Sequence, residues 1–246
     1  MLFFSPLEQF QILPYLTVKI FFLEISVYNN AFIAFLSIFM FFLIYDMSLA
    51  YKTNETFIIF ELIYETVSGM VFDNIGEKGQ IYFPFIISIF LFVLMINVIG
   101  LIPYSFTMTS HLCVTLALAL TIFIGINIIG IKTHGLHMLT LFLPAGTSLG
   151  MALILVPIEI VSYFVKPISL SVRLFANMMA GHTLLKVIAG FAWSMFSAGG
   201  LLFIAHFVPI FVLILLMGLE FGVAIIQAYV FTILTCIYLN DAINLH

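Results

Sequence analysis

Long apolar runs, interrupted by single polar residues, dominate the chain. Three of them, residues 30–49, 83–102 and 111–131, are each close to the roughly 20 residues that span a bilayer as a helix. The runs are continuous, whereas the strands of a membrane β-barrel alternate between apolar and polar positions. Helices satisfy their own backbone hydrogen bonds in lipid, so three membrane-spanning helices are predicted here.

Two later segments stay apolar for much longer. No polar loop interrupts residues 147–190 or residues 201–239. A helix of about 39 residues is roughly 58 Å long, whereas the hydrocarbon core is about 30 Å thick. Because two spans would need a polar hairpin between them, each segment is predicted as one long, steeply tilted helix that bends at its prolines or glycines. A hairpin at residues 194–200 joins the two.

The remaining segments are more polar. Residues 1–29 mix prolines and charges with aromatic residues, which predicts an interfacial segment. Residues 55–76 place apolar side chains in a helical stripe, with Glu61 and Glu65 on the opposite face. This pattern predicts an amphipathic helix at the membrane surface or, preferably, against a partner subunit.

The predicted fold class follows from these elements. It is an all-α integral membrane protein with about five membrane-embedded helices plus an amphipathic surface helix. We expect a single membrane domain over residues 1–246, in which residues 83–131 form a two-span hairpin and residues 147–245 form the hairpin of two long tilted helices.

Composition supports this class and narrows the function. Hydrophobic residues make up 64% of the chain and charged residues 7%, whereas soluble domains have roughly 45–50% and about 25%. The net charge of −4 and the lack of a basic run argue against nucleic-acid binding. No nucleotide-binding loop is present, so any ATP chemistry belongs to partner subunits. We expect no cofactor and no bound metal.

Ionisable residues inside the first long segment are the main functional signal, because each costs about 2.5–3.5 kcal/mol at mid-membrane on insertion scales. Glu159, Lys166 and Arg173 are seven residues apart and lie close to one helical face. Asn177 follows four residues later on that face, whereas His182 points to the other side. Arg173 is the single arginine of the chain.

The second long segment carries its own polar pair. Glu220 and Gln227 share a helical face. Gly218 and Gly222 flank Glu220 and are expected to clear space there for close helix approach.

The residue types suggest proton movement. Arginine stays protonated and cannot relay a proton, whereas glutamate and histidine can. A fixed cation between titratable groups suits a device that moves protons by two separate routes. Structural alternatives remain open: Lys166 and Lys186 can snorkel to an interface, Arg173 can form an internal salt bridge, and Glu220 can be a structural partner of His182.

Four runs carry a family resemblance: NVIGLIP from Asn97, LPAG from Leu143, SLSVRLFANMMAGH from Ser169 and GLEFGVAIIQAYVFTIL from Gly218. Together they resemble the a subunit of F-type ATP synthases, in its mitochondrial branch. Position 182 holds His and the next helix holds Glu220, whereas common bacterial members exchange these two types. The exchange favours an interacting pair and a mitochondrial origin.

The resemblance implies a proton-translocating stator subunit of the Fo sector. Its two long helices would pack against a rotating ring of c subunits that supplies a carboxylate in trans to Arg173. Glu220 and His182 would belong to the entry path from the intermembrane side, and Glu159 and Asp241 to the matrix-side path. The remaining polar pair would border Arg173 at the ring: Asn177 and Gln227.

Further expectations follow from the same resemblance. Other partners would be peripheral-stalk and other Fo subunits, membrane lipids and protons. The location would be the mitochondrial inner membrane or, alternatively, a bacterial plasma membrane. Two other functions stay open on the residues alone: a proton-coupled secondary transporter or antiporter-like respiratory subunit, and a purely structural membrane subunit.

Overall fold

The computed structural model describes residues 10–20, 23–50, 55–102, 106–135 and 149–244. Contacts divide the chain into two compact units, each made of segments far apart in the sequence. The first unit comprises Met1–Leu43, Phe92–His111 and Leu174–Ala228, and the second comprises Ile44–Leu91, Leu112–Arg173 and Tyr229–His246. Each unit is described separately.

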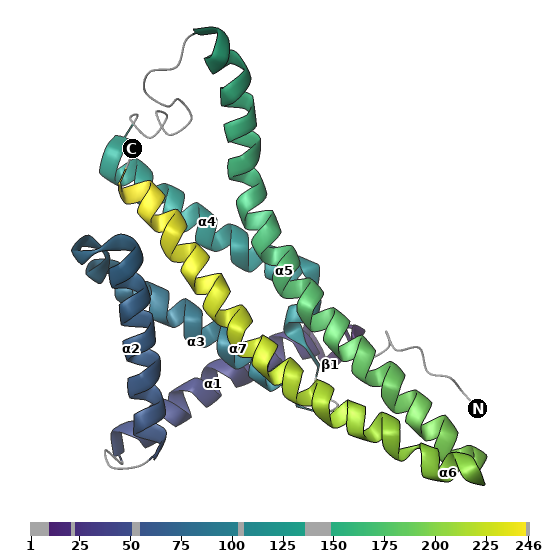
Figure 1. Cartoon of the computed structure of the whole chain (residues 1–246). Coiled ribbons are helices and arrows are strands. Elements are labelled where there is room, and N and C mark those ends of the chain that lie inside the picture. The colour runs from purple at the N-terminus through teal and green to yellow at the C-terminus, as the bar shows by residue number, and fades with distance from the viewer. Residues whose placement is uncertain (1–9, 21–22, 51–54, 103–105, 136–148, 245–246) are drawn as a thin grey trace. The chain divides into compact units, whose positions relative to one another are not determined.

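Helices form nearly all of the described structure (Figure 1). The α-helices are α1 (Asn29–Ala50), α2 (Glu55–Ile75), α3 (Phe83–Gly100), α4 (Leu112–His134), α5 (Leu149–Ala198), α6 (Leu201–Ala205) and α7 (Phe207–Ile243). Short 3-10 helices precede α3 and α4, namely η2 (Glu77–Tyr82) and η3 (Met108–Ser110).

Within the described residues, four helical stretches are long and apolar enough to cross a membrane. They are Gly79–Gly100, Leu112–His134, Leu153–Ala198 and Phe203–Ile243. The predicted class, an all-α membrane protein, is confirmed.

A short β-hairpin in the first unit was not predicted. Strands β1 (Pro14–Ile20) and β2 (Leu23–Tyr28) pair antiparallel within the segment expected to be merely interfacial. Val18 lies opposite Ile25, and Lys19 lies opposite Glu24. The segment is rich in β-branched and aromatic residues, which favour strands. The sequence lacks a two-residue turn signature of Asn or Gly, which is why the hairpin was missed.

Helix α5 is the longest element, at 50 residues, and continues through Pro157 and Pro167. At 1.5 Å per residue it is about 75 Å long. The helix ends at Ala198, later than predicted, because the expected turn covered residues 194–200. The chain reverses direction with only Gly199 and Gly200, whose φ angles are 68° and 63°. Glycine adopts this left-handed conformation without steric cost, so two residues suffice to end the helix.

Helix α7 then runs antiparallel to α5 within each unit. In the first unit, Leu174 and Met178 of α5 and Ala224 and Ala228 of α7 are buried. Helix α3 joins this packing, because Asn97 Nδ2 donates a hydrogen bond to the backbone carbonyl of Ala224 at 3.4 Å. Small residues on α7 therefore allow both neighbouring helices to come close.

Helix α2, in the second unit, differs in part from its prediction. Glu61 and Glu65 are exposed, as a surface helix requires. Its opposite face is buried within this chain, at Val67, Met70, Val71 and Ile75. Other apolar side chains of α2 stay exposed, among them Leu62, Tyr64 and Phe72, so the expectation of a partner subunit on this helix stays a prediction. One of the covering elements is η2, whose Gly79 lies directly against Val71 and Ile75.

The Gly79→Ala variant tests this contact. An added Cβ would lie 2.8 Å from Cβ of Ile75 and 3.0 Å from Cγ1 of Val71. Overpacking of this kind costs about 1–3 kcal/mol, so we expect a lower unfolding temperature of the purified protein in detergent. Gly69→Ala is the control, because nothing lies within 4 Å of its added Cβ. In the α2 interior that change is expected to be neutral or to stabilise by up to about 1 kcal/mol. Equal melting temperatures for both variants would contradict the contact.

Candidate functional site

A hydrogen bond joins the polar residues of α5 and α7 in the first unit. Asn177 Nδ2 donates to Oε1 of Gln227 at 2.9 Å. Asn177 is exposed, whereas Gln227 is buried and its Nε2 has no hydrogen-bond partner among the described residues. Helical phase alone predicted which face each residue occupies, and the pairing across helices is a finding of the structure.

Glu220 precedes Gln227 by seven residues on the same face of α7, and it is buried closely against α5. Its side chain is 6% exposed, and neither carboxyl oxygen has a hydrogen-bond partner among the described residues. It fits because α5 has a glycine opposite it. A methyl group placed on Gly181 would lie 2.9 Å from both Cγ and Cδ of Glu220.

The glycines expected to clear this space were the wrong ones. In the described part of the chain, nothing lies within 4 Å of a Cβ added at Gly218 or Gly222. Gly181, on the facing helix α5, provides the space for Glu220 instead. Its only signal in the sequence was its position next to His182, which is not specific.

His182 is half-buried on α5, and its Nε2 has no hydrogen-bond partner among the described residues. No hydrogen bond or ion pair links it to Glu220 there, so their interaction stays a prediction. Buried Asn97 likewise leaves its Oδ1 without a partner in that part of the chain. Buried polar atoms are nearly always hydrogen-bonded, commonly to ordered water. The described part of the first unit therefore leaves several buried polar atoms unsatisfied, those of Glu220 among them.

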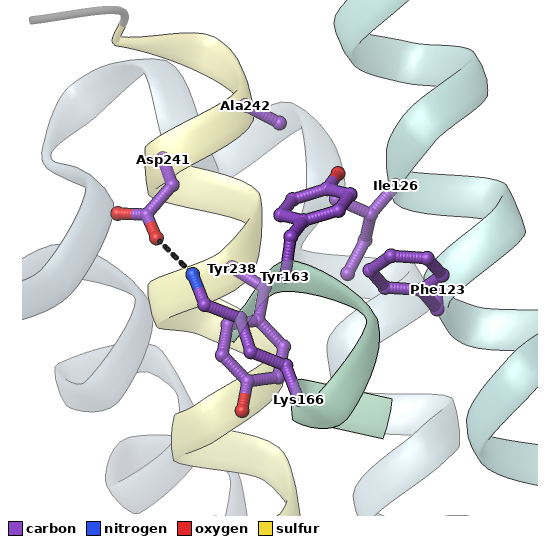
Figure 2. A pocket seen from close by; sticks show the side chains of 7 residues that line it. All are labelled: Phe123, Ile126, Tyr163, Lys166, Tyr238, Asp241 and Ala242. Atoms are coloured by element: carbon purple, nitrogen blue, oxygen red, sulfur yellow. Dashed lines mark hydrogen bonds and ion pairs between the residues drawn. The ribbon is translucent and has the colours of Figure 1, made fainter. Parts of the chain in front are cut away.

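A second polar cluster lies in the second unit, where α4, α5 and α7 meet (Figure 2). Lys166 Nζ of α5 lies 3.3 Å from Oδ2 of Asp241 on α7. The same ammonium group lies 5.7 Å from the ring centre of Tyr163 and 5.1 Å from that of Tyr238. The Tyr163 hydroxyl donates to Oδ1 of Asn127 on α4 at 2.5 Å.

This cluster changes the view of Lys166. Sequence reasoning left it as a snorkelling lysine and assigned Asp241 by resemblance alone. The two residues are 75 positions apart in the sequence with no pairing signal between them, so the ion pair could not be predicted.

Arg173, on α5 in the second unit, is exposed and has no hydrogen bond or ion pair among the described residues. The internal salt bridge that the sequence left open is therefore not formed in this part of the chain. Glu159, one further residue of the predicted set, is half-buried on the same helix and likewise has no such partner there. Next to Arg173, Val172 is 43% exposed and Leu174 is fully buried, which shows that the arginine lies on the outward side of α5.

Comparisons with known proteins identify a family. The family model described as ATP synthase A chain matches residues 29–240. "ATP synthase subunit a" of Pylaiella littoralis is 54% identical over 249 residues, covering 100% of both chains. The proteins of the same name from Chondrus crispus and Paramagnetospirillum magneticum are 52% and 45% identical and cover 98% of this chain. The two matches cover 97% and 99% of those relatives' own lengths.

The contact of Gly181 with Glu220 leads to a test of the site. In Gly181→Ala the carboxyl group must move to relieve the clash. A shift of about 1 Å at a reacting group can cost on the order of 100-fold, so we expect at least a roughly tenfold loss of proton flux per assembled complex in membranes. Gly190→Ala, on the same helix with nothing within 4 Å of its added Cβ, should keep its flux. Normal flux in Gly181→Ala would show that the position of Glu220 does not matter.

Proposed function

The chain belongs to the ATP synthase A chain family, and we propose that it moves protons through two separate half-channels that meet a ring of partner subunits at Arg173. Membership makes it the proton-translocating stator subunit of Fo, working among the other subunits of that sector. The alternatives of a secondary transporter and of a purely structural subunit are excluded by the same match.

The exposed, unpaired state of Arg173 is the observation that carries the proposal. A guanidinium group is charged at any relevant pH, and a charge in an apolar helix needs a counter-charge. Among the described residues none lies within salt-bridge distance. A carboxylate supplied by another subunit would complete the pair, which agrees with a c ring that carries one carboxylate on each of its subunits.

The polar residues of α5 fall on both sides of Arg173 along the helix. Towards the C-terminus lie Asn177 and His182, and in the first unit α7 adds Glu220 and Gln227. We assign this group to the entry path from the intermembrane side. Support comes from the buried Glu220 carboxyl and the unpartnered polar atoms around it.

Towards the N-terminus of α5 lies Glu159, and the second unit also contains Asp241 near the end of α7. We assign these two carboxyl groups to the release path on the matrix side. Their partial exposure supports access from water.

Arg173 then acts as counter-charge and barrier. A ring carboxylate must be neutral to pass through lipid, and the arginine favours its ionisation when the ring brings it close. Because the guanidinium group keeps its own proton, it passes no proton between the two paths. The membrane potential supplies about 2.3 kcal/mol per charge per 100 mV, and it drives rotation only while the paths stay separate.

The location follows as part of the proposal. The chain is a membrane protein, and we place it in the mitochondrial inner membrane, with a peripheral stalk and other Fo subunits as neighbours. The relatives include one from Paramagnetospirillum magneticum, so a plasma membrane is the alternative that cell fractionation would distinguish.

Replacing Arg173 tests the function directly. In Arg173→Gln we expect ATP synthesis and ATP-driven proton pumping to fall by on the order of 100-fold or more, because the charge stabilisation at the reacting carboxylate is lost. Arg173→Lys should rescue little, since lysine lacks the planar fork. Both activities are measured in membranes and normalised to assembled complex. Undiminished coupled activity in Arg173→Gln would refute the assignment.

The partner surface has its own test. A cysteine at exposed position 172 should cross-link to a c subunit carrying a cysteine near its carboxylate, because the outward side of α5 would face the ring. Leu174→Cys is the control, because Leu174 is fully buried. Cross-linking is detected by gel mobility in the intact complex. Failure of Val172→Cys to cross-link, or equal yields from both variants, would argue against a ring on this side.

A further inference from the structure

We propose that Lys166 is a positioning residue of the release path, whose ammonium group holds the Asp241 carboxylate in place through their ion pair. This inference deepens the proposed function and rests on it. It concerns the cluster in the second unit, all of whose residues lie on α4, α5 and α7 (Figure 2).

The ion pair is the first part of the argument. Lys166 Nζ and Asp241 Oδ2 are 3.3 Å apart, and the two side chains are 32% and 34% exposed. Exposed ion pairs contribute little because both side chains move freely in water. About two-thirds of this pair is covered by neighbouring side chains, so those neighbours determine the position of the lysine.

Aromatic rings provide that hold. The ammonium group lies within 6 Å of the ring centres of Tyr163 and Tyr238, at distances typical of cation–π contacts. Tyr163 is itself fixed by its hydrogen bond to Asn127 and by packing against Phe123, with ring centres 4.9 Å apart. The cavity beside these side chains measures about 10 Å³, at the lower limit for one water molecule. Lysine is normally a flexible, mobile charge, and here its movement is restricted from several sides.

Proton release needs a carboxyl group that is held in a fixed position. In the proposed path, Asp241 accepts a proton that has left a ring carboxyl group and then donates it to water on the release side. The ion pair with Lys166 keeps the carboxyl group at one position, where it can both receive the proton and pass it on. Lys166 itself takes up no proton and acts only through the aspartate.

Lys186 provides a matched comparison. It is a half-buried lysine on the same helix, and it has no ion-pair partner among the described residues. Neutralising it removes the same charge from α5 without touching Asp241.

The experiment measures passive proton flux through Fo in membranes after removal of the catalytic sector, normalised to the assembled a subunit. We expect Lys166→Met to lower this flux roughly tenfold. A misplaced reacting group can cost on the order of 100-fold, so a loss of this size is reasonable for a group that acts through another residue. Lys166→Arg, which can still pair with the carboxylate and stack on tyrosine, should restore at least half of the flux. Lys186→Met should keep it. If Lys166→Met does not assemble, Lys166→Gln tests the same loss of charge.

A double variant separates positioning from general stability. If Lys166 acts through Asp241, the variant that combines Lys166→Met with Asp241→Asn should have the flux of Asp241→Asn alone. A further drop would overturn the proposal, as would unchanged flux per assembled subunit in Lys166→Met or an equal loss in Lys186→Met. Arg173→Gln serves as the reference. Undiminished ATP synthesis there would refute the proposed function, whereas loss of ATP synthesis there with normal flux in Lys166→Met would refute the positioning role alone.

Discussion

Polar groups inside apolar helices need partners, and this requirement explains much of the described structure. Many hydroxyl groups are satisfied locally, as when Ser171 donates to the carbonyl of Ile168 at 2.9 Å. Longer side chains reach across to another helix, as in the pairs Asn177–Gln227 and Lys166–Asp241. Each cross-helix pair fixes the depth and rotation at which two helices meet. Arg173 has no such partner among the described residues, which supports the proposal that the outward side of α5 meets the ring.

The predictions that succeeded were those that depend on periodicity. Seven-residue spacing placed Glu220 and Gln227 together, and the structure buries both on α7. Apolar runs of unusual length predicted α5 and α7, because no polar turn divided them. These are properties of one helix at a time, and 3.6 residues per turn is enough to derive them.

The predictions that failed required knowledge of what faces a helix. Gly218 and Gly222 had the expected spacing beside Glu220, yet the close contact is made by Gly181, 39 residues earlier. In the sequence Lys166 and Lys186 look alike, because each is a lysine in a long apolar segment. The structure distinguishes them, because Asp241 lies beside Lys166. A partner was expected on the apolar side of α2, and the chain itself covers only the part of it formed by Val67, Met70, Val71 and Ile75. Rotation of one helix against another is decided by packing, which a single sequence does not encode in any local pattern.

The contact at Gly181 has a consequence for how the protein tolerates change. Most buried positions respond in proportion to the size of the new side chain, because neighbours shift a little at each step. Here the first added carbon already meets the carbon skeleton of Glu220, at 2.9 Å. Alanine would therefore be nearly as harmful as valine, and saturation mutagenesis should show a step in place of a gradient.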